Sequence, residues 1–295
     1  MRFGVGLPTT VAGVTGRDVV AWAIRSEQAG LSSLGVLDRL VYANQEPITT
    51  LAAVAAVTQR IELMTSILLA AYRDSANVLA KQLATVDDIA GGRLVVGVAG
   101  GGRPDDFEAA GADFHHRGAR LDAMLRQIRL TWAGTTGIGP GPVSPPPVLV
   151  GGHSPAAMRR AARIGQGWIM GGTSAVPLAE LVGELHRQWR LAGREEPPRL
   201  VALTYFALGQ DGHEAAQRHI HAYYGANGYA DRVAASVLTE EVEVRAAARR
   251  YAEVGFDTLL FFPCRPGLDQ VDRLADALTR ASFDQTSVSV APSGQ

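Results

Sequence analysis

Residues 151–154 read Gly-Gly-His-Ser and combine the features of an anion-binding turn. The glycines end a short apolar stretch, serine is a common N-cap residue, and Pro155 is a favoured first residue of a helix. Such a turn offers free backbone N–H groups and the positive end of a helix dipole to a phosphate. An ordinary tight turn with a serine cap accounts for these residues equally well. The candidate phosphate ligands are Gly151, Gly152, His153 and Ser154.

A second glycine-rich segment, residues 99–103, reads Ala-Gly-Gly-Gly-Arg and follows the apolar run 94–98. Glycines let a flat ring or an extended chain lie directly against the backbone. Arg103 could neutralise a phosphate or the anionic part of a ring. The alternatives are a flexible hinge before a long loop and an arginine whose charge is solvated in that loop.

Asp38 and Arg39 follow another apolar run, residues 31–37. They could pair with each other, bind a polar substrate or form a structural salt bridge. Cys264 is the one cysteine of the chain, which excludes an internal disulfide and a thiolate metal cluster, and packing is its expected role. Surface positions are expected for histidines that lie in loop or helix patterns without partner ligands: His115, His116, His219 and His221.

Apart from the histidines of loops and helices, the candidate residues lie at or just after the carboxyl end of an expected strand. The expected strands are 2–7, 31–37, 61–69, 94–98, 148–152, 167–172, 199–208 and 256–262. Helical patterns separate them at about 17–29, 47–59, 75–90, 117–133, 154–165, 176–192, 212–254 (in two or three pieces) and 268–281. A strand that is apolar on both faces is typical of a parallel sheet covered by helices.

Eight strands that alternate with helices predict an α/β fold, a single (β/α)₈ TIM barrel over residues 1–283. Residues 284–295 are expected to form a polar C-terminal tail. A doubly wound open sheet is the alternative, but no G-x-G-x-x-G motif follows the first strand. In a barrel, the carboxyl ends of the strands assemble the site, which would bring the candidate residues together.

The composition indicates a globular protein with a large core, since 47% of the 295 residues are hydrophobic and 19% are charged. The 28 basic and 29 acidic residues nearly cancel, which gives no electrostatic case for nucleic acid or for an acidic membrane surface. The apolar runs stop short of the ~20 residues of a membrane-spanning helix. The amino-terminal residues lack the features of a signal peptide, so a cytoplasmic protein is expected.

Three segments resemble the bacterial luciferase-like family of flavin- and deazaflavin-dependent oxidoreductases. They are KQLATVDDIAGGRLVVGVAGGGRPDDFEAAGADFHHRGARLDAML, PPVLVGGHSPAAMRRAARIGQGWIMGG and GFDTLLFFPCRPGLDQVDRLADAL. The match covers nearly the whole chain in the right order. It implies a (β/α)₈ barrel, in agreement with the strand count, and a reduced flavin that lies across the mouth with its phosphate at residues 151–154.

The resemblance also implies further cofactor-binding residues. It places Ser66 and Ile67 at a bulge with a non-prolyl cis peptide behind the isoalloxazine ring. Ala99 and Gly101 match positions beside the ring edge. Gly171, at the end of the sixth expected strand, completes the cofactor-binding set.

Three features depart from the family pattern. The common Asp-His pair is Asp38-Arg39 here, so a mechanism that uses this histidine as a base lacks it. Gly102 stands where many relatives carry an aromatic residue or, in sugar-phosphate dehydrogenases, a glutamate. The segment from Gly134 to Pro145 is shorter than usual, and relatives place there an insertion that helps to cover the substrate. We therefore expect a more open pocket or one that a partner chain completes.

The leading hypothesis is a flavoprotein monooxygenase or related oxidoreductase that uses reduced FMN, supplied by a separate flavin reductase, and O₂ on a small organic substrate. Its candidate catalytic residues are Arg39, Asp38 and Arg103. The alternative is hydride transfer with coenzyme F420, whose polyglutamate tail could bind Arg159, Arg160 and Arg163. A barrel without a cofactor that acts as a binding or scaffold subunit is the third hypothesis. The resemblance also implies a homodimer through early barrel helices.

Overall fold

The computed structural model describes residues 1–142, 144–225 and 228–286. Within these residues, eight parallel strands pair in sequence order and close into a barrel, because β8 also pairs with β1. The predicted (β/α)₈ barrel is therefore confirmed. The strands are β1 (Arg2–Gly6), β2 (Ser33–Val36), β3 (Glu62–Leu69), β4 (Leu94–Ala99), β5 (Val148–Gly151), β6 (Gly167–Met170), β7 (Arg199–Phe206) and β8 (Thr258–Pro263).

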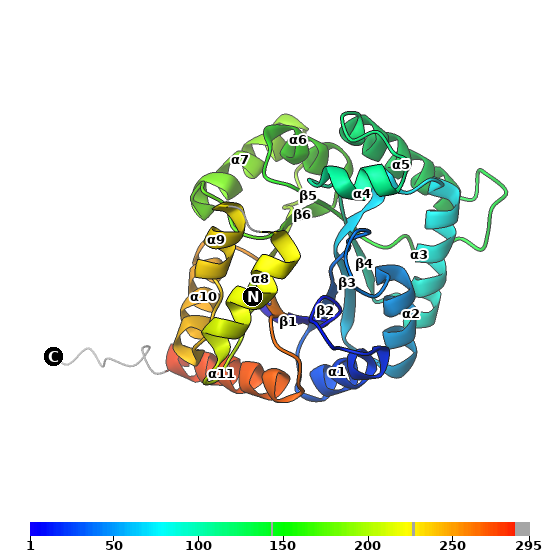
Figure 1. Cartoon of the computed structure of the whole chain (residues 1–295). Helices are drawn as coiled ribbons and strands as arrows, with labels where there is room; N and C mark the ends of the chain where they lie inside the picture. Colours follow the sequence, from blue (N-terminus) through cyan, green and yellow to red (C-terminus); the bar gives the residue numbers. More distant parts are fainter. Residues whose placement is uncertain (143, 226–227, 287–295) are drawn as a thin grey trace.

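Helices form a ring around the barrel (Figure 1). The ring consists of α1 (Gly16–Gln28), α2 (Pro47–Val57), α3 (Ala76–Ala90), α5 (Arg117–Trp132), α6 (Pro155–Ile164), α7 (Leu178–Leu191), α10 (Glu241–Glu253) and α11 (Asp269–Thr286). Helix α11 continues past the predicted domain boundary at residue 283. Residues 287–295 of the expected tail lie outside the described residues.

The helices begin and end at residues that are typical caps. Ser75 begins α3 by accepting a hydrogen bond from the Val78 N–H, and Gly91 ends it with a φ of 63°. Because an L side chain is strained in this left-handed region, glycine is the residue suited to that end. Thr15 and Asp18 form a reciprocal capping box at the start of α1.

Alternate residues of each strand serve two hydrophobic cores, which is why the strands are apolar on both faces. In β3, Leu63 packs against the helices whereas Met64 belongs to the cluster inside the barrel. In β4, Val96 likewise packs against the helices, and Val95 belongs to the cluster inside the barrel. All four side chains are buried, so the even apolarity read from the sequence reflects burial on both sides of the sheet.

Ion pairs close the amino-terminal end of the barrel. The guanidinium of Arg199, at the start of β7, donates hydrogen bonds of 2.5 and 3.1 Å to the two carboxylate oxygens of Glu62, at the start of β3. Arg2 lies 3.6 Å from the same carboxylate. These contacts tie three strands together at the end opposite the carboxyl-terminal mouth.

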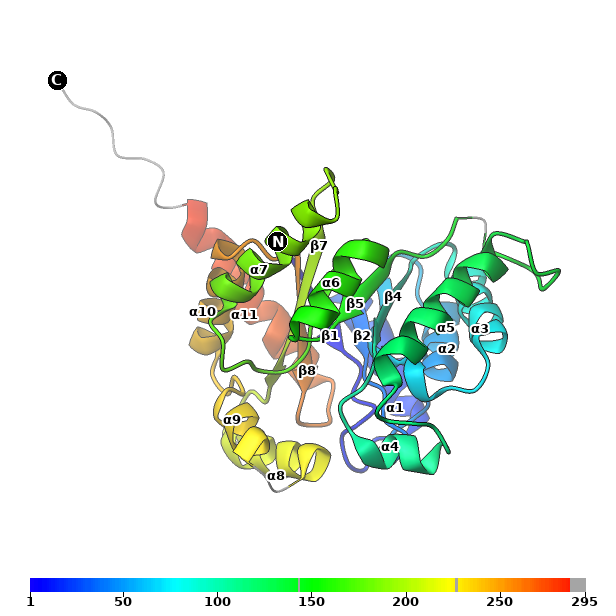
Figure 2. The ribbon, with the colours of Figure 1, turned by 90° about the horizontal axis from the view of Figure 1, so that it is seen from above.

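Helices outside this ring occupy the mouth: η1 (Ala70–Tyr72), α4 (Pro104–Ala109), α8 (Gly212–Tyr224) and α9 (Gly228–Ala235). Figure 2 shows α4 at one side of that end and α8 and α9 at the other. The sequence indicated helix pieces over 212–254 but not α4. Helices α8 and α9 depart from the outer ring because they form an excursion after β7, which α10 then follows.

The segment from Gly134 to Pro145 does not lie at the mouth, contrary to the expectation that its short length would open the pocket. This segment joins the end of α5 to the start of β5, so it leads to the amino-terminal end of the barrel. None of its described residues lines the cavity at the mouth. Its short length therefore does not open the pocket.

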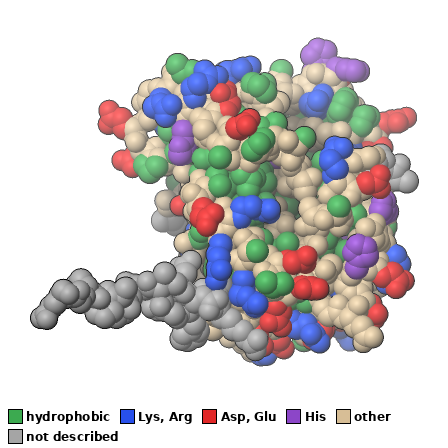
Figure 3. All heavy atoms as spheres, turned by 90° about the vertical axis from the view of Figure 1, so that its left-hand side faces the viewer, with side chains coloured by type: hydrophobic (Ala, Val, Ile, Leu, Met, Phe, Trp, Pro, Cys, Tyr) green, Lys and Arg blue, Asp and Glu red, His purple; other side chains and the backbone are tan. Residues whose placement is uncertain are grey.

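The charge distribution agrees with the balanced composition. Acidic and basic side chains are interspersed on the face that Figure 3 draws. Within the described residues, no helix has both the length and the apolar character needed to cross a bilayer.

Candidate functional site

A cavity of about 740 Å³ lies at the carboxyl ends of the strands. Its size falls within the ~300–1,000 Å³ that is usual for small-molecule sites. The wall contains every residue predicted for the site from the sequence: Asp38, Arg39, Ser66, Ile67, Ala99, Gly101, Arg103, Gly151, Gly152, His153, Ser154 and Gly171. The barrel thus brings together residues from the carboxyl-terminal parts of five strands, β2 to β6.

The bulge predicted in β3 is present. The Ser66–Ile67 peptide bond is cis, and the pairing of β3 with β4 shifts register between Thr65 and Leu68. The Ile67 side chain extends over the ends of β5 and β6. A Cβ at Gly151 would stand 2.6 Å from its Cδ1 atom, and one at Gly171 would stand 3.3 Å away. These two glycines therefore leave the room that the Ile67 side chain occupies.

The turn at residues 151–154 is held from two sides. Ser154 caps α6 by accepting a 3.2 Å hydrogen bond from the Ala157 N–H. The indole N–H of Trp168 donates a 2.9 Å hydrogen bond to the Gly152 carbonyl. The turn therefore has a fixed shape at the amino end of a ten-residue helix, where a helix dipole favours an anion.

His153 completes this turn as a half-buried imidazole beside Trp168. Burial lowers the pKa of His153 below its ordinary value, and a hydrogen bond to the Gly171 backbone acts against that shift. The side chain is therefore neutral at neutral pH and can take part in hydrogen bonds without adding charge.

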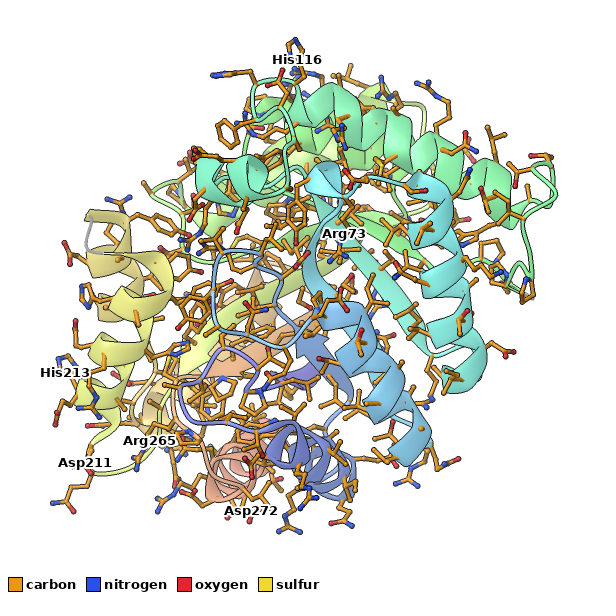
Figure 4. All side chains as sticks on the ribbon, turned by 45° about the vertical axis from the view of Figure 1, so that its right-hand side comes forward. Arg73, His116, Asp211, His213, Arg265 and Asp272 are labelled. Atoms are coloured by element: carbon orange, nitrogen blue, oxygen red, sulfur yellow. The ribbon has the colours of Figure 1, made fainter. Side chains whose placement is uncertain are left out.

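Asp38 and Arg39 take different partners, although they are adjacent in the chain. The Asp38 carboxylate accepts hydrogen bonds of 2.8 Å from the Leu69 N–H, 2.8 Å from the Tyr72 hydroxyl and 3.2 Å from Arg73. Burial raises the pKa of Asp38, while these donors act against the shift. Figure 4 labels Arg73, which lies near the η1 turn, whereas His116 points away from the protein. Asp38 thus fixes the chain that follows β3.

Arg39 ties α4 and α8 to the loop after β2. Its buried guanidinium pairs with Asp105 and Asp106, each at 2.9 Å, and donates to the carbonyls of Val41 and Tyr223. Asp106 is fully buried and also accepts the N–H groups of residues 40 and 41. All the nitrogens of the Arg39 guanidinium therefore have protein partners, and this geometry is that of a positioning residue.

Arg103 lies in a different environment. The guanidinium carbon of Arg103 is 5.3 Å from the ring centre of Tyr223 and 5.1 Å from that of Tyr224. Both tyrosines belong to α8, which covers part of the mouth. Among the described residues, the Nη2 atom of Arg103 has no hydrogen-bond partner although it is buried.

Several lining residues were not predicted as site residues. Arg117 donates a 3.1 Å hydrogen bond to the Gly101 carbonyl, so it shapes the glycine-rich loop. Tyr229, on α9, lies so close to Gly172 that a Cβ there would stand 2.3 Å from the Tyr229 hydroxyl. The sequence carried no local signal for these residues, because helices far from the glycine loops place them.

His115 also lines the cavity, and its exposed position agrees with the prediction for it. The surface prediction for His219 is wrong. This residue is 6% exposed and its ring stacks on Tyr223 at 6.2 Å, because α8 lies across the mouth with one face packed inward. Cys264 is buried in the cluster inside the barrel, as expected for a packing residue.

The protein is a (β/α)₈ barrel, because its eight parallel strands close on themselves. Its ligand-sized cavity lies at the carboxyl-terminal mouth, where barrels of this class have their active sites. Residues 1–257 match the family model described as luciferase-like monooxygenase. The chain therefore belongs to the luciferase-like monooxygenase family.

Curated relatives match part of the chain. An uncharacterized protein of Mycobacterium tuberculosis is 32% identical over 174 residues, which are 55% of this chain and 60% of that protein. The F420-dependent glucose-6-phosphate dehydrogenase of Amycolatopsis mediterranei is 29% identical over 175 residues, 52% of this chain and 53% of the enzyme. The chain thus spans little more than half the length of these relatives.

Solved structures show the same fold over nearly the whole chain. The monooxygenase RslO1 from Streptomyces bottropensis superposes with a TM-score of 0.76 at 23% identity and covers 97% of this chain and 100% of its own. An F420-dependent secondary alcohol dehydrogenase, solved with an F420–acetone adduct, superposes with a TM-score of 0.82 at 15% identity. The match covers 95% of this chain and 98% of the dehydrogenase chain. At such identities the likeness establishes the fold alone.

Proposed function

We propose that this protein is an oxidoreductase that binds reduced FMN across the mouth of its barrel and oxygenates a small organic substrate. One observation carries the proposal: the bulge at Ser66–Ile67 and the capped turn at 151–154 line the same cavity. A flat ring needs a firm apolar support, and a phosphate needs free N–H groups at a fixed distance from that ring. Strands β3 and β5, which flank β4, would provide the two on one side of the cavity.

The residues present fit such a cofactor. Gly152, His153 and Ser154 would hold the phosphate at the start of α6, with the carbonyl of Gly152 kept away by Trp168. Ile67 would support the ring, and Ala99 and Gly101 would lie at its edge. A side chain at residue 151 would collide with Ile67, so the glycine keeps this wall in place.

A reduced flavin supplies the redox chemistry when it is bound, including the activation of O₂. The chain's own part is to bind, orient and exclude water. Leu37, Leu203 and the tyrosines of α8 contribute apolar and aromatic surface to the cavity wall. The Asp38 carboxylate is engaged by three donors, so it orders the bulge region rather than moving a proton. This division of labour suits an enzyme whose cofactor carries the reaction.

Coenzyme F420 is the second candidate cofactor, and hydride transfer without O₂ would then be the reaction. The similarity to an F420-dependent glucose-6-phosphate dehydrogenase supports it. The three arginines that could bind its polyglutamate tail differ in their ion pairs and in their exposure to solvent. Arg160 and Arg163 both pair with Asp122, at 2.8 and 3.2 Å, whereas Arg159 is exposed. A cofactor-free scaffold barrel is the third candidate.

A separate flavin reductase and a homodimer belong to the same proposal. Exposed apolar side chains on the early helices support a dimer through that face. They are Ile24 on α1, Val57 on α2, and Val78 and Ile89 on α3, each at least 36% exposed.

An anaerobic titration of the purified protein with reduced FMN and, separately, reduced F420 tests the proposal, followed by rapid mixing with aerated buffer. Tight binding of reduced FMN and an absorbance transient that depends on O₂ are expected. Binding of F420 alone would replace the oxygenase with a hydride-transfer enzyme. Binding of neither would leave the scaffold as the remaining candidate.

A further inference from the structure

Arg103 stands out among the arginines that line the cavity. Within the described residues these are Arg39, Arg103, Arg117 and Arg160. Arg39 pairs with two aspartates, Arg160 forms a bidentate pair with Asp122, and Arg117 donates to the carbonyls of Gly101 and Phe114. For Arg103 the structure gives two ring contacts and no hydrogen bond or ion pair among the described residues.

The surroundings of Arg103 do not neutralise its charge. Its two neighbours are the rings of Tyr223 and Tyr224, and burial raises the pKa of both hydroxyls, so they are uncharged phenols at neutral pH. The carboxylate that lines the cavity, Asp38, accepts its hydrogen bonds from Leu69, Tyr72 and Arg73. A half-buried guanidinium with an unsatisfied donor is costly unless a ligand supplies an acceptor.

The position of Arg103 separates it from the turn proposed for the phosphate. Arg103 follows β4 and packs on α8, whereas residues 151–154 connect β5 to α6. The tyrosines that flank Arg103 also line the cavity, and Tyr229 of α9 extends the same wall. A positive group and an aromatic surface therefore lie side by side beneath the helices that cover the mouth.

We infer that Arg103 is a specificity residue that binds the carboxylate of the substrate, and that the substrate is an organic acid whose apolar or aromatic body packs against Tyr223, Tyr224 and Tyr229. This inference rests on the proposed function, because it assigns the substrate class of the same cavity. The planar guanidinium presents paired donors that match the two oxygens of a carboxylate. The tyrosine rings hold the guanidinium plane in place and offer their own faces to the ligand.

Calorimetric titration of the whole protein with matched acids and amides tests the inference. The probes are benzoate, phenylacetate and cinnamate, each compared with its neutral amide of nearly the same shape. We expect at least one acid to bind the wild type about tenfold more tightly than its amide, as a hydrogen-bonded charge pair requires. Arg103→Met should remove that preference, and Arg103→Lys should keep part of it.

Arg190→Met is the control, because Arg190 is an exposed arginine of α7 outside the cavity wall and should retain the full preference. Thermal unfolding of each variant checks that it is folded. Equal binding of every acid and its amide, or no binding of either, would overturn the inference. So would an Arg103→Met variant that keeps the preference.

A parallel titration with reduced FMN separates this inference from the proposed function. If reduced FMN fails to bind but the acid preference still depends on Arg103, the proposed function fails and the carboxylate site stands. Arg103→Met could instead lower the affinity for reduced FMN and leave the affinity for the acids unchanged. Arg103 would then serve the cofactor, and the carboxylate site would be overturned.

Discussion

The Cδ1 methyl group of Ile67 lies where a side chain of residue 151 would begin, since a Cβ at Gly151 would be only 2.6 Å from it. This close approach couples the bulge of β3 to the end of β5, two strands away in the barrel. The wall behind the proposed ring and the first residue of the proposed phosphate turn are thus a single packed unit.

Gly151→Ala tests this coupling. The added methyl group must push Ile67 into the cavity, and overpacking of this kind costs about 1–3 kcal/mol. We expect the affinity for reduced FMN to fall about tenfold or more, which equals about 1.4 kcal/mol. Fluorescence titration and urea unfolding measure the two effects.

Gly183→Ala is the matched control for Gly151→Ala. Gly183 lies within α7, and a Cβ there meets nothing within 4 Å. Because alanine suits a helix interior better than glycine, this variant should be more stable by about 0.5–1 kcal/mol and should bind reduced FMN like the wild type. A Gly151→Ala protein that binds reduced FMN normally would contradict the coupling.

Arg39→Met distinguishes a positioning role from a catalytic one. The variant keeps an unbranched apolar stem but leaves the buried Asp106 carboxylate without its guanidinium partner. Breaking a buried pair in this way costs about 3–5 kcal/mol. We expect a large loss in the free energy of unfolding, measured in urea, together with reduced turnover.

Asp106→Asn in the same background provides the control, because removal of the unpaired charge should restore part of the stability. A direct catalytic role predicts a different pattern for Arg39→Met. Turnover would then be lost while the unfolding free energy stayed at the wild-type value.

The barrel and the residues of its mouth were predictable because they depend on local patterns. Runs that are apolar on both faces mark covered strands, and the strand ends specify which residues meet at the mouth. Gly151 and Ser154 were therefore identifiable from the sequence. The roles of the charged residues were not, because Arg39 and Arg103 have the same local setting, each after a strand.

The partners of these arginines come from distant segments. Arg39 meets Asp106 of α4, and Arg103 meets two rings of α8, so only the packing of both helices decides which guanidinium is free. The path of α8 was equally hidden. A helix after a strand is expected in the outer ring, whereas α8 lies over the mouth and buries His219 and Tyr223 there.

The proposed dimer face can be tested with charge substitutions on α3. Val78 and Ile89 are 56% and 44% exposed, and Val78→Asp with Ile89→Asp would place two carboxylates in an apolar interface. Because unpaired charges are costly to bury, the double variant should be monomeric in light scattering, whereas the wild type should be dimeric. Leu191→Asp on α7, at a position 69% exposed, should leave the dimer intact. A dimeric double variant would exclude this face.

The burial of His219 makes the free energy of unfolding depend on pH. Burial lowers its pKa from 6.5 to about 4, so the unfolded chain binds a proton at this residue at a higher pH than the folded chain. Stability from His219 is therefore complete above about pH 6.5 and is lost as the pH falls toward 4. Urea unfolding at about pH 7.5 and about pH 5 should show a loss of about 2 kcal/mol from this residue.

His219→Phe should remove that part of the pH dependence, since phenylalanine keeps a ring against Tyr223 and has no proton to bind. The control is His186→Gln, at an exposed position of α7, which should retain the wild-type dependence. The buried Nε2 atom of His219 has no hydrogen-bond partner among the described residues, so its replacement should cost little stability at neutral pH. An unchanged difference between the two pH values in His219→Phe would show that another group controls the acid response.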